Sequence, residues 1–442
     1  MTITRFAPSP TGHLHVGNLR TALMNFLIAR KVTGQFILRL DDTDRERSKT
    51  AFSDSIREDL NWLGLHWDRL ERQSDRLERY LKAADQLRAM GRLYEAFETP
   101  SELELKRKKQ RNMGRPPVYD RAALSLTEAE KTALRSERGN GVWRFKLDHE
   151  RVTWIDGILG EVSIDTASLS DPVLIRRDGQ FLYTLASVVD DIEMEITDVV
   201  RGSDHVTNTA IQCQIIRALG GSVPRFAHHS LLTGPKGEPF AKRVGANALR
   251  VLRQTGIEPM ALLSLLARLG TSDPVVVYQN LTEVVDAFDI SRFGASATKF
   301  DEQLLFPLSG KYLQTLTFEA VAAEIKYLGV PESLAEKFWL TTRDNISTKQ
   351  DLATWWLIFR DGADPEIAEE DREFVNVALE ILPERPFDEN TWANWTRDVK
   401  EKTDRRGRGL FMPLRKALTG QSSGPDMGAV MPLLQVIKAK AL

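Results

Sequence analysis

The sequence predicts an α/β fold in which a doubly wound parallel sheet is interrupted by an inserted module and followed by an all-α region. An apolar run at residues 3–6, a Pro/Gly-rich loop and apolar residues at helical spacing from Leu19 to Leu27 predict strand, loop and helix, with a second strand at residues 36–40. Strand–helix–strand patterning returns between residues 196 and 232. Because parallel strands require helical crossovers, both segments are expected to share one sheet.

The remaining elements follow in chain order. Gly34 lies just past the first helix and is a candidate for its C-cap, and residues 71–90 have the charge pattern of a helix. Near Tyr94 a proline-containing segment begins that suggests a module of mixed helices and strands. From about Pro331 the chain is expected to be almost entirely helical. We therefore predict five segments: 1–93 (first half of the sheet domain), 94–175 (inserted module), 176–232 (second half), 233–330 (mainly helical) and 331–442 (helical).

Composition restricts the class of protein. The chain has 442 residues, with 60 Lys and Arg against 62 Asp and Glu, so its net charge is −2. A single cysteine, Cys213, excludes an intrachain disulfide and suits a reducing compartment. No apolar run reaches the roughly 18 residues of a membrane span, and the N-terminus lacks the layout of a signal peptide. We expect a cytoplasmic protein that does not enter a membrane.

The loop from Arg5 to Arg20 is the most informative part of the chain. It follows a strand, carries His15 and leads directly into a helix. Amide groups that are free at a helix N-terminus attract phosphate, and a glycine such as Gly17 lets the backbone come close to a nucleotide. The outline is that of a nucleotide-phosphate site.

This loop, with His15-Val16-Gly17-Asn18 at its centre, closely resembles the HIGH signature of class I aminoacyl-tRNA synthetases, in the form used by the glutamyl-tRNA synthetase family. Asn18 stands where the second histidine of the motif would be. The resemblance implies a Rossmann-type catalytic domain, an inserted tRNA acceptor-binding module and an anticodon-binding domain at residues 331–442. It also implies ATP with Mg²⁺, L-glutamate, and tRNA(Glu) or tRNA(Gln) or both, and we expect a monomer.

A second family signature, the KMSKS loop, is matched only in part by residues 237–245. Lys242 and Arg243 match the motif and are predicted to bind ATP, with Lys242 and His15 as the catalytic pair. Pro239 replaces the first lysine and Ala241 replaces the serine, and proline offers neither charge nor a backbone donor. Two interpretations stay open. Either Lys236 reaches the phosphates instead, or the loop is slower but adequate.

The predicted amino-acid pocket rests on charge. A glutamate side chain needs a cation, and a guanidinium binds a carboxylate with bidentate geometry that lysine cannot provide. Arg5 and Arg201 match the side-chain contacts of the family, and Asp41, where many relatives carry Glu, would meet the substrate ammonium. The resemblance also assigns to the pocket Ala7, Ser9, Tyr183 and, weakly, Ser187.

Zinc is not expected. Many family members place cysteines in the tract that here runs from Phe97 to Leu103, but Ala96 and Glu98 occupy the probable cysteine positions.

The basic run from Lys106 to Arg111 suits phosphates about as well as it suits a solvated helix face. The tryptophans at 355, 356, 392 and 395 are more typical of packing than of base stacking.

Two other functions remain as alternatives. A glutamyl-queuosine tRNA synthetase is a truncated relative that lacks the helical domain, so the roughly 110 residues after Pro331 argue against it. A duplicated synthetase that binds tRNA but no longer activates glutamate would explain the altered lysine loop. Retention of His15, Arg5, Arg201 and Lys242 argues against that reading.

Overall fold

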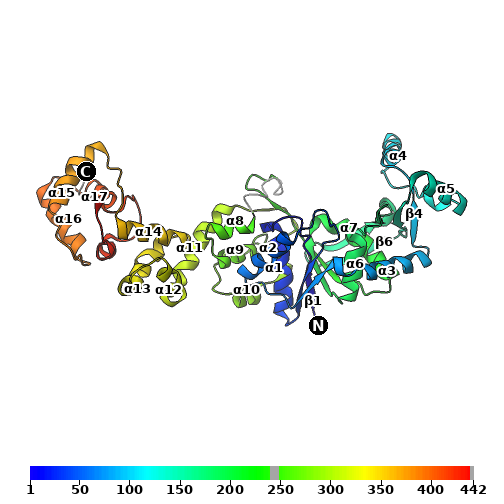
Figure 1. Cartoon of the computed structure of the whole chain (residues 1–442), viewed down its shortest axis with the longest axis horizontal. Helices are drawn as coiled ribbons and strands as arrows, with labels where there is room; N and C mark the ends of the chain where they lie inside the picture. The colour runs from blue at the N-terminus through cyan, green and yellow to red at the C-terminus, as the bar shows by residue number, and fades with distance from the viewer. Residues whose placement is uncertain (239–247, 439–442) are drawn as a thin grey trace. The chain divides into compact units, whose positions relative to one another are not determined.

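The computed structural model describes residues 1–238 and 248–438 and divides into two compact units. Unit 1 comprises Met1–Val251, Leu266–Val276 and Asn280–Asp301, and unit 2 comprises Leu252–Leu265, Val277–Gln279 and Glu302–Leu442. The two units are described separately below, with the element labels of Figure 1.

Unit 1 contains two sheets of mainly parallel strands. The first has the order β1-β2-β3 and the second the order β7-β6-β10-β9, in which only the β6–β7 pair is antiparallel. Their bounds are β1 Ile3–Phe6, β2 Gln35–Leu40, β3 Arg69–Arg72, β6 Arg151–Asp156, β7 Gly160–Asp165, β9 Asp198–Gly202 and β10 Arg225–His229. Short strands β11 (Leu232–Thr233) and β12 (Thr298–Lys299) pair separately.

The two sheets adjoin through β1 and the start of β9. The Thr197 amide donates to the Ile3 carbonyl (3.0 Å), and the Ile3 amide donates to Thr197 Oγ1 (2.8 Å). The strand order therefore reverses at this junction, as in a doubly wound sheet. The predicted fold class is confirmed, and the reversal is where such sheets bind ligands.

Helices cover these sheets. Helix α1 packs against β1, β2 and β9, so the helix that begins at the His15 loop is held against both sheets. The helices of unit 1 other than those of the module below are α1 Val16–Lys31, α2 Thr50–Trp62, α3 Leu77–Ala89, α6 Tyr183–Glu193, α7 Val206–Ala218 and α10 Leu281–Ala287. The predicted helix at residues 71–90 is shorter, because its first two residues belong to β3.

Gly34 does not cap α1, so that prediction was wrong. The C-cap residue is Val32, and Thr33 takes the left-handed conformation (φ 52°). Gly34 is needed for a different reason: a Cβ there would lie 2.3 Å from the carbonyl oxygen of Thr2. The glycine permits close contact between chain segments rather than an unusual backbone angle.

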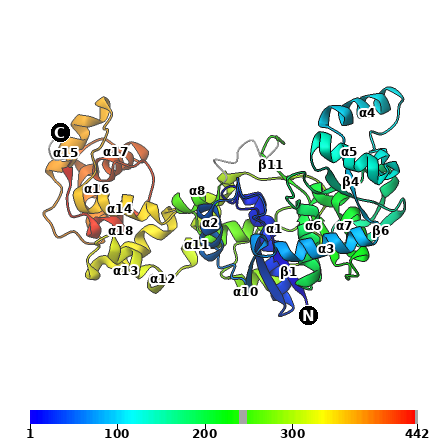
Figure 2. The same ribbon diagram turned by 45° about the vertical axis from the view of Figure 1, so that its right-hand side comes forward.

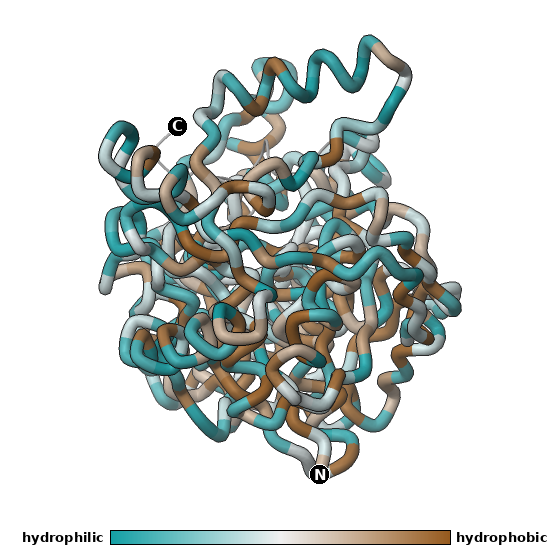
Figure 3. Tube along the Cα trace, turned by 90° about the vertical axis from the view of Figure 1, so that its right-hand side faces the viewer, coloured by the Kyte–Doolittle hydropathy of each residue, from teal (hydrophilic) through white to brown (hydrophobic). Residues whose placement is uncertain are grey.

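The segment between the two halves of the sheet forms its own layer. An antiparallel sheet of the order β4-β5-β8 carries two helices that bury none of their residues, α4 and α5. The bounds are β4 Leu93–Ala96, α4 Pro100–Asn112, α5 Glu128–Arg138, β5 Val142–Phe145 and β8 Val173–Ile175. Figure 2 shows both helices beyond β4, and α4, along the top of Figure 3, is coloured almost wholly as hydrophilic. The β6–β7 hairpin lies instead in the sheet with β9 and β10.

Unit 2 is helical over its described residues from 302 to 438, as the sequence predicted for the part after Pro331. Its helices from residue 305 onward are α11 Leu305–Thr315, α12 Phe318–Tyr327, α13 Glu332–Thr342, α14 Gln350–Asp361, α15 Glu369–Glu380, α16 Thr391–Lys402, α17 Arg408–Thr419 and α18 Met427–Val430. The short helices α8 (Leu249–Gln254) and α9 (Pro259–Leu266) precede them in the chain. None of the helices in the described part of the chain is long and apolar enough to cross a membrane.

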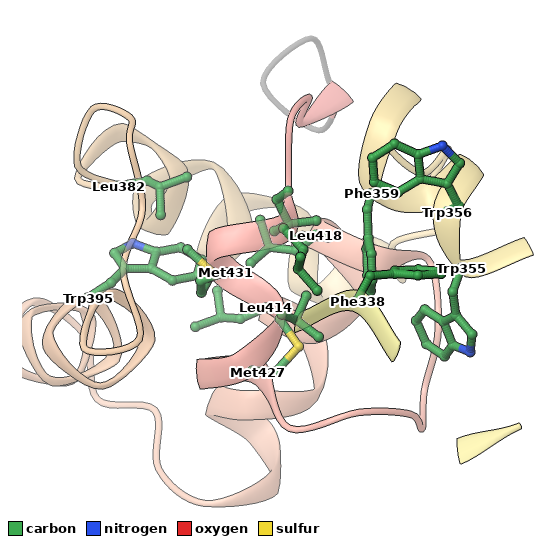
Figure 4. Close-up of a cluster of buried hydrophobic side chains, with 14 of the residues drawn as sticks. Phe338, Trp355, Trp356, Phe359, Leu382, Trp395, Leu414, Leu418, Met427 and Met431 are labelled. Carbon is green, nitrogen blue, oxygen red and sulfur yellow. The ribbon is translucent and has the colours of Figure 1, made fainter. Parts of the chain in front are cut away.

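The tryptophans of unit 2 are packing residues, which confirms the prediction. Trp355, Trp356 and Trp395 are at most 7 % exposed, and Trp392 packs against the same core cluster. Figure 4 shows three of these indoles among leucine, methionine and phenylalanine side chains. Trp395 Nε1 also donates to the Ala378 carbonyl (2.8 Å), which fixes α16 against α15.

Candidate active site

The predicted site residues converge where the strand order reverses. Arg5 lies in β1, Asp41 directly follows β2, and Arg201 lies in β9, close to the carboxyl end of each strand. The loop after β1 leads to His15 at the start of α1. The topology thus gathers four predicted residues at one edge of the sheet.

His15 is the N-cap of α1 and forms a reciprocal capping box with Asn18. The Asn18 amide donates to His15 Nδ1 (3.3 Å), and the His15 amide donates to Asn18 Oδ1 (3.2 Å). Burial lowers the pKa of His15 below its ordinary value, so the ring is neutral at pH 7. The ring is fixed in place as a neutral group beside the first amides of the helix, which suits it to phosphate binding.

Gly17 has no side chain, and the imidazole ring of His15 occupies the space where one would lie. A Cβ at Gly17 would lie 2.9 Å from His15 Cε1 and 3.0 Å from Nδ1. We expect Gly17→Ala to lower the rate of ATP–pyrophosphate exchange at least tenfold, because the imidazole must move. Stability should stay within about 1 kcal/mol of wild type, since alanine favours a helix while the displaced cap disfavours it. Exchange kinetics beside a thermal melt check this, and an unchanged exchange rate would contradict it.

Arg39 is the centre of a buried charge cluster that the sequence analysis missed. Its side chain is fully buried and contacts three carboxylates: Nε lies 2.8 Å from Asp41 Oδ1 and 3.7 Å from Asp190 Oδ2, and Nη1 lies 2.6 Å from Asp191 Oδ1. Asp191 also binds Arg5, whose Nε is 3.1 Å away. The available signals were a lone arginine in the largely apolar β2 sequence and the Asp190-Asp191 pair after a run of buried residues in helix α6.

The Asp41 carboxyl titrates near neutrality. Burial raises its pKa to about 6, while Arg39 and, more weakly, Arg5 act in the opposite direction. The pKa of Asp191 is instead lowered: burial would raise it, but the two arginines that contact it prevail. At pH 7 both carboxyls are therefore charged, but Asp41 becomes protonated at a higher pH than Asp191 does.

Arg201 is a buried cation without an acidic partner. It is 5 % exposed, and no carboxylate in the described ranges lies within ion-pair distance of it. Its partners are neutral groups: Tyr183 Oη (3.2 Å), Thr209 Oγ1 (2.6 Å), Gln212 Oε1 (2.7 Å) and His228 Nε2 (3.4 Å). Burial and the charge of Arg5 lower its pKa, so an anion placed here would be stabilised.

The other predicted residues lie in different surroundings. Ser187 is fully buried, and its hydroxyl accepts from Arg39 Nη2 (3.3 Å), whereas Ala7 is half-buried and Ser9 is exposed. Lys242 and Arg243, together with Pro239 and Ala241, lie outside the described residues. Lys236 is exposed, and its amide donates to Glu238 Oε2 (3.0 Å).

The tract in which many family members place zinc-binding cysteines forms a polar cluster of another kind here. Glu98 accepts from Tyr119 Oη (3.0 Å) and pairs with Lys106 (3.1 Å), which also binds Asp120. No group of three or more His, Cys, Asp or Glu residues positioned to hold a metal ion occurs within residues 1–238 and 248–438. Burial raises the pKa of the Cys213 thiol to about 11.

The fold is that of a class I tRNA synthetase. The sequence model described as "tRNA synthetases class I (E and Q), catalytic domain" matches residues 1–306, and the model of an anticodon binding domain matches residues 334–437. The chain belongs to the glutamate–tRNA ligase family of these synthetases.

Three relatives illustrate the similarity. The chain is 67 % identical to glutamate–tRNA ligase 1 of Ruegeria pomeroyi, covering 100 % of this chain and 99 % of the relative. It is 64 % identical to glutamate–tRNA ligase 2 of a Ruegeria species, covering 100 % of both. A crystal structure of a glutamate tRNA ligase from Elizabethkingia meningosepticum in complex with its amino acid has a TM-score of 0.82 at 28 % identity, covering 98 % of this chain and 96 % of that one.

Proposed function

We propose that the chain is an ATP-dependent ligase that activates L-glutamate to glutamyl-adenylate and transfers it to the 3′ end of tRNA(Glu), tRNA(Gln) or both. The observation that carries this proposal is Arg201, a buried guanidinium whose partners are all neutral. Leaving such a charge without a counter-ion is costly, and a bound side-chain carboxylate would supply one. The full-length similarity to glutamate–tRNA ligases supports the same substrate.

The neighbouring groups complement the rest of the amino acid. Arg5 and Arg201 would bind the side-chain carboxylate, and Asp41 would bind the ammonium group. Tyr183, half-exposed beside Arg201, would line the pocket with Ala7, Ser9 and Ser187. The α-carboxylate would then be free to attack the α-phosphate of ATP, a reaction that needs alignment and charge stabilisation rather than a protein nucleophile.

ATP would meet the start of α1, where His15 and the first helix amides face the phosphates. Gly17 and Asn18 would complete that contact, with Lys242 and Arg243 contributing from their loop. Mg²⁺ is held in many such sites mainly by the substrate phosphates, and it would neutralise part of their charge. Residues 94–175 and 331–442 would contact the acceptor end and the anticodon of tRNA, respectively, and we propose a cytoplasmic monomer.

One assay tests the function. Transfer of radiolabelled glutamate is measured with purified tRNA(Glu) and tRNA(Gln), side by side, in the presence of ATP and Mg²⁺. Labelled product on either tRNA supports the ligase, and the pair of rates shows which tRNA is charged. Binding of tRNA without transfer would instead favour the duplicated, inactive synthetase, and label in the anticodon base would favour the queuosine-modifying relative.

Lysine substitutions test the ATP loop. We expect Lys242→Ala to abolish ATP–pyrophosphate exchange, because it removes the remaining lysine of the motif and Pro239 offers no replacement. Loss of its hydrogen bond to phosphate alone, about 1.5–3 kcal/mol, would slow the exchange about ten- to a hundredfold. Lys236→Ala shows whether the upstream lysine compensates for Pro239. A rate of ATP–pyrophosphate exchange at least tenfold below wild type in this variant would mean that it does. An unchanged rate in Lys242→Ala would refute the assignment of this loop.

Acid should weaken glutamate binding through Asp41. Its pKa of about 6 means that the carboxylate is charged above pH 6 and protonated below, so kcat/KM for glutamate should fall as the pH drops through 6. The loss should approach tenfold per pH unit. Asp41→Asn should have a low kcat/KM throughout, without this step. A step of equal size in kcat/KM for ATP, or a step that persists in Asp41→Asn, would contradict the assignment and point to His15.

A further inference from the structure

His228 lies behind Arg201 and is not among the residues assigned to the pocket. Its ring is fully buried and packs between aromatic side chains, with Phe226 stacked at 6.1 Å and Trp154 tilted at 6.3 Å. Both of its ring nitrogens have hydrogen-bond partners. Nδ1 bonds to Asp156 Oδ2, and Nε2 faces Arg201 and Thr209.

The partners of the ring determine which nitrogen carries the proton. Asp156 is acceptor-only when ionised, and it accepts from both Nδ1 and the backbone amide of His228 (3.0 Å). Burial would raise the pKa of Asp156, but these bonds and those from the amides of Leu159 and Ile158 hold it well below the ordinary value. Asp156 is thus ionised and Nδ1 carries the hydrogen. Nε2 is the acceptor of the ring, because the Nε–H group of Arg201 donates to it.

That acceptor completes the hydrogen bonding of Arg201. Nε of Arg201 donates to His228 Nε2 (3.4 Å), and Nη2 donates to Thr209 Oγ1, whose own hydroxyl lies 2.9 Å from the same Nε2. Nη2 also donates to Gln212, and one hydrogen of Nη1 is accepted by Tyr183. Of the five donors of a guanidinium, only the second hydrogen of Nη1 has no acceptor in the described part of the chain.

This arrangement keeps the charge of Arg201 available. A carboxylate in direct contact, such as Asp191 against Arg5, would neutralise the cation and compete with an incoming anion. At Arg201 the carboxylate of Asp156 makes contact only through the imidazole ring of His228. The guanidinium is oriented on its buried side without being neutralised, and its Nη1 edge remains for the substrate.

We propose that Asp156 and His228 are positioning residues that orient Arg201 toward the side-chain carboxylate of glutamate while leaving it without a direct counter-ion. The inference rests on the proposed function. It also gives the β6–β7 hairpin a part in amino-acid binding, because Asp156 and Trp154 both lie in β6.

Two substitutions of His228 separate orientation from packing. Asparagine carries its amide at the place of Nδ1, so His228→Asn keeps the contact to Asp156 and loses the acceptor for Arg201. Glutamine reaches the place of Nε2, so His228→Gln keeps an acceptor for Arg201. We expect KM for glutamate to rise about tenfold in His228→Asn, the loss typical of one hydrogen bond to a charged group, and no more than about threefold in His228→Gln. KM for ATP and kcat should stay within about twofold of wild type in both.

The inference is overturned if His228→Asn leaves KM for glutamate within twofold of wild type, or if both variants raise it equally. If His228→Asn does not fold, Thr209→Val takes its place, since valine keeps the shape and removes the hydroxyl between Arg201 and His228. An unchanged KM for glutamate in that variant would likewise overturn the inference. A wild-type chain that transfers no glutamate would overturn the proposed function, and this inference with it, whereas an active wild type with an unaffected His228→Asn overturns the inference alone.

Discussion

Replacing Arg201 with glutamine should lower kcat/KM for glutamate by about a thousandfold. The substitution removes a buried cation that has only neutral partners, so the substrate carboxylate loses its charge-assisted bonds. The free hydrogen of Nη1 and the one that Tyr183 accepts in the unbound chain would each form such a bond. Two bonds of about 1.5–3 kcal/mol each correspond to a loss of between about a hundredfold and ten-thousandfold. The effect should fall on KM for glutamate more than on KM for ATP, because the guanidinium lies in the proposed amino-acid pocket.

Steady-state ATP–pyrophosphate exchange with tRNA present measures this effect. Arg217→Gln is a matched control on helix α7, since Arg217 is half exposed and forms an ion pair with the surface residue Glu150. It should leave both KM values unchanged. A loss of less than tenfold in Arg201→Gln, or an equal loss in the control, would refute the role of Arg201 as the carboxylate-binding residue.

Arg39→Met should have the largest effect on stability, a loss of about 3–5 kcal/mol in the free energy of unfolding of unit 1. Arg39 is fully buried and contacts Asp41, Asp190 and Asp191. Methionine fills a similar volume but leaves these buried carboxylates with too little positive charge. The penalty arises from the orphaned acids rather than from the loss of favourable pairing energy.

Urea unfolding followed by circular dichroism measures this change. Arg47→Met is the control, because Arg47 is 72 % exposed and its pair with Asp44 should contribute no more than about 1 kcal/mol. Adding Asp191→Asn to Arg39→Met should recover part of the stability, since one orphaned carboxylate is removed. If Arg39→Met were no less stable than Arg47→Met, the buried cluster would not be a structural requirement.

Much of the fold could be read from patterns along the chain. Strand β1, helix α1 and strand β2 follow the predicted bounds to within a few residues, because apolar periodicity and the position of the loop are local signals. The helical nature of the region after Pro331 and the packing role of its tryptophans are equally local, since each depends on composition within a short window. The β6–β7 hairpin shows the opposite case, because its partner β10 lies some 70 residues further along the chain.

The site shows the same division. The loop with His15, Gly17 and Asn18 was recognisable because its residues are neighbours and its chemistry depends on their spacing. Arg39, Asp190, Asp191 and His228 were missed, because each acts through a contact with residues distant in the chain. In the sequence these residues stand out only as charged residues inside apolar segments. The sequence does not show which partners such residues contact.

The sequence by itself determined the class of fold, and it indicated the loop with His15 and the two arginines of the proposed amino-acid pocket. Only the tertiary structure decided how those arginines differ: Arg5 is paired with Asp191, whereas Arg201 is oriented by neutral groups and keeps its charge. The physical reason is that burial and counter-ions set the electrostatic state of a side chain. Both depend on which segments the fold brings together, and adjacent residues in the sequence do not specify them.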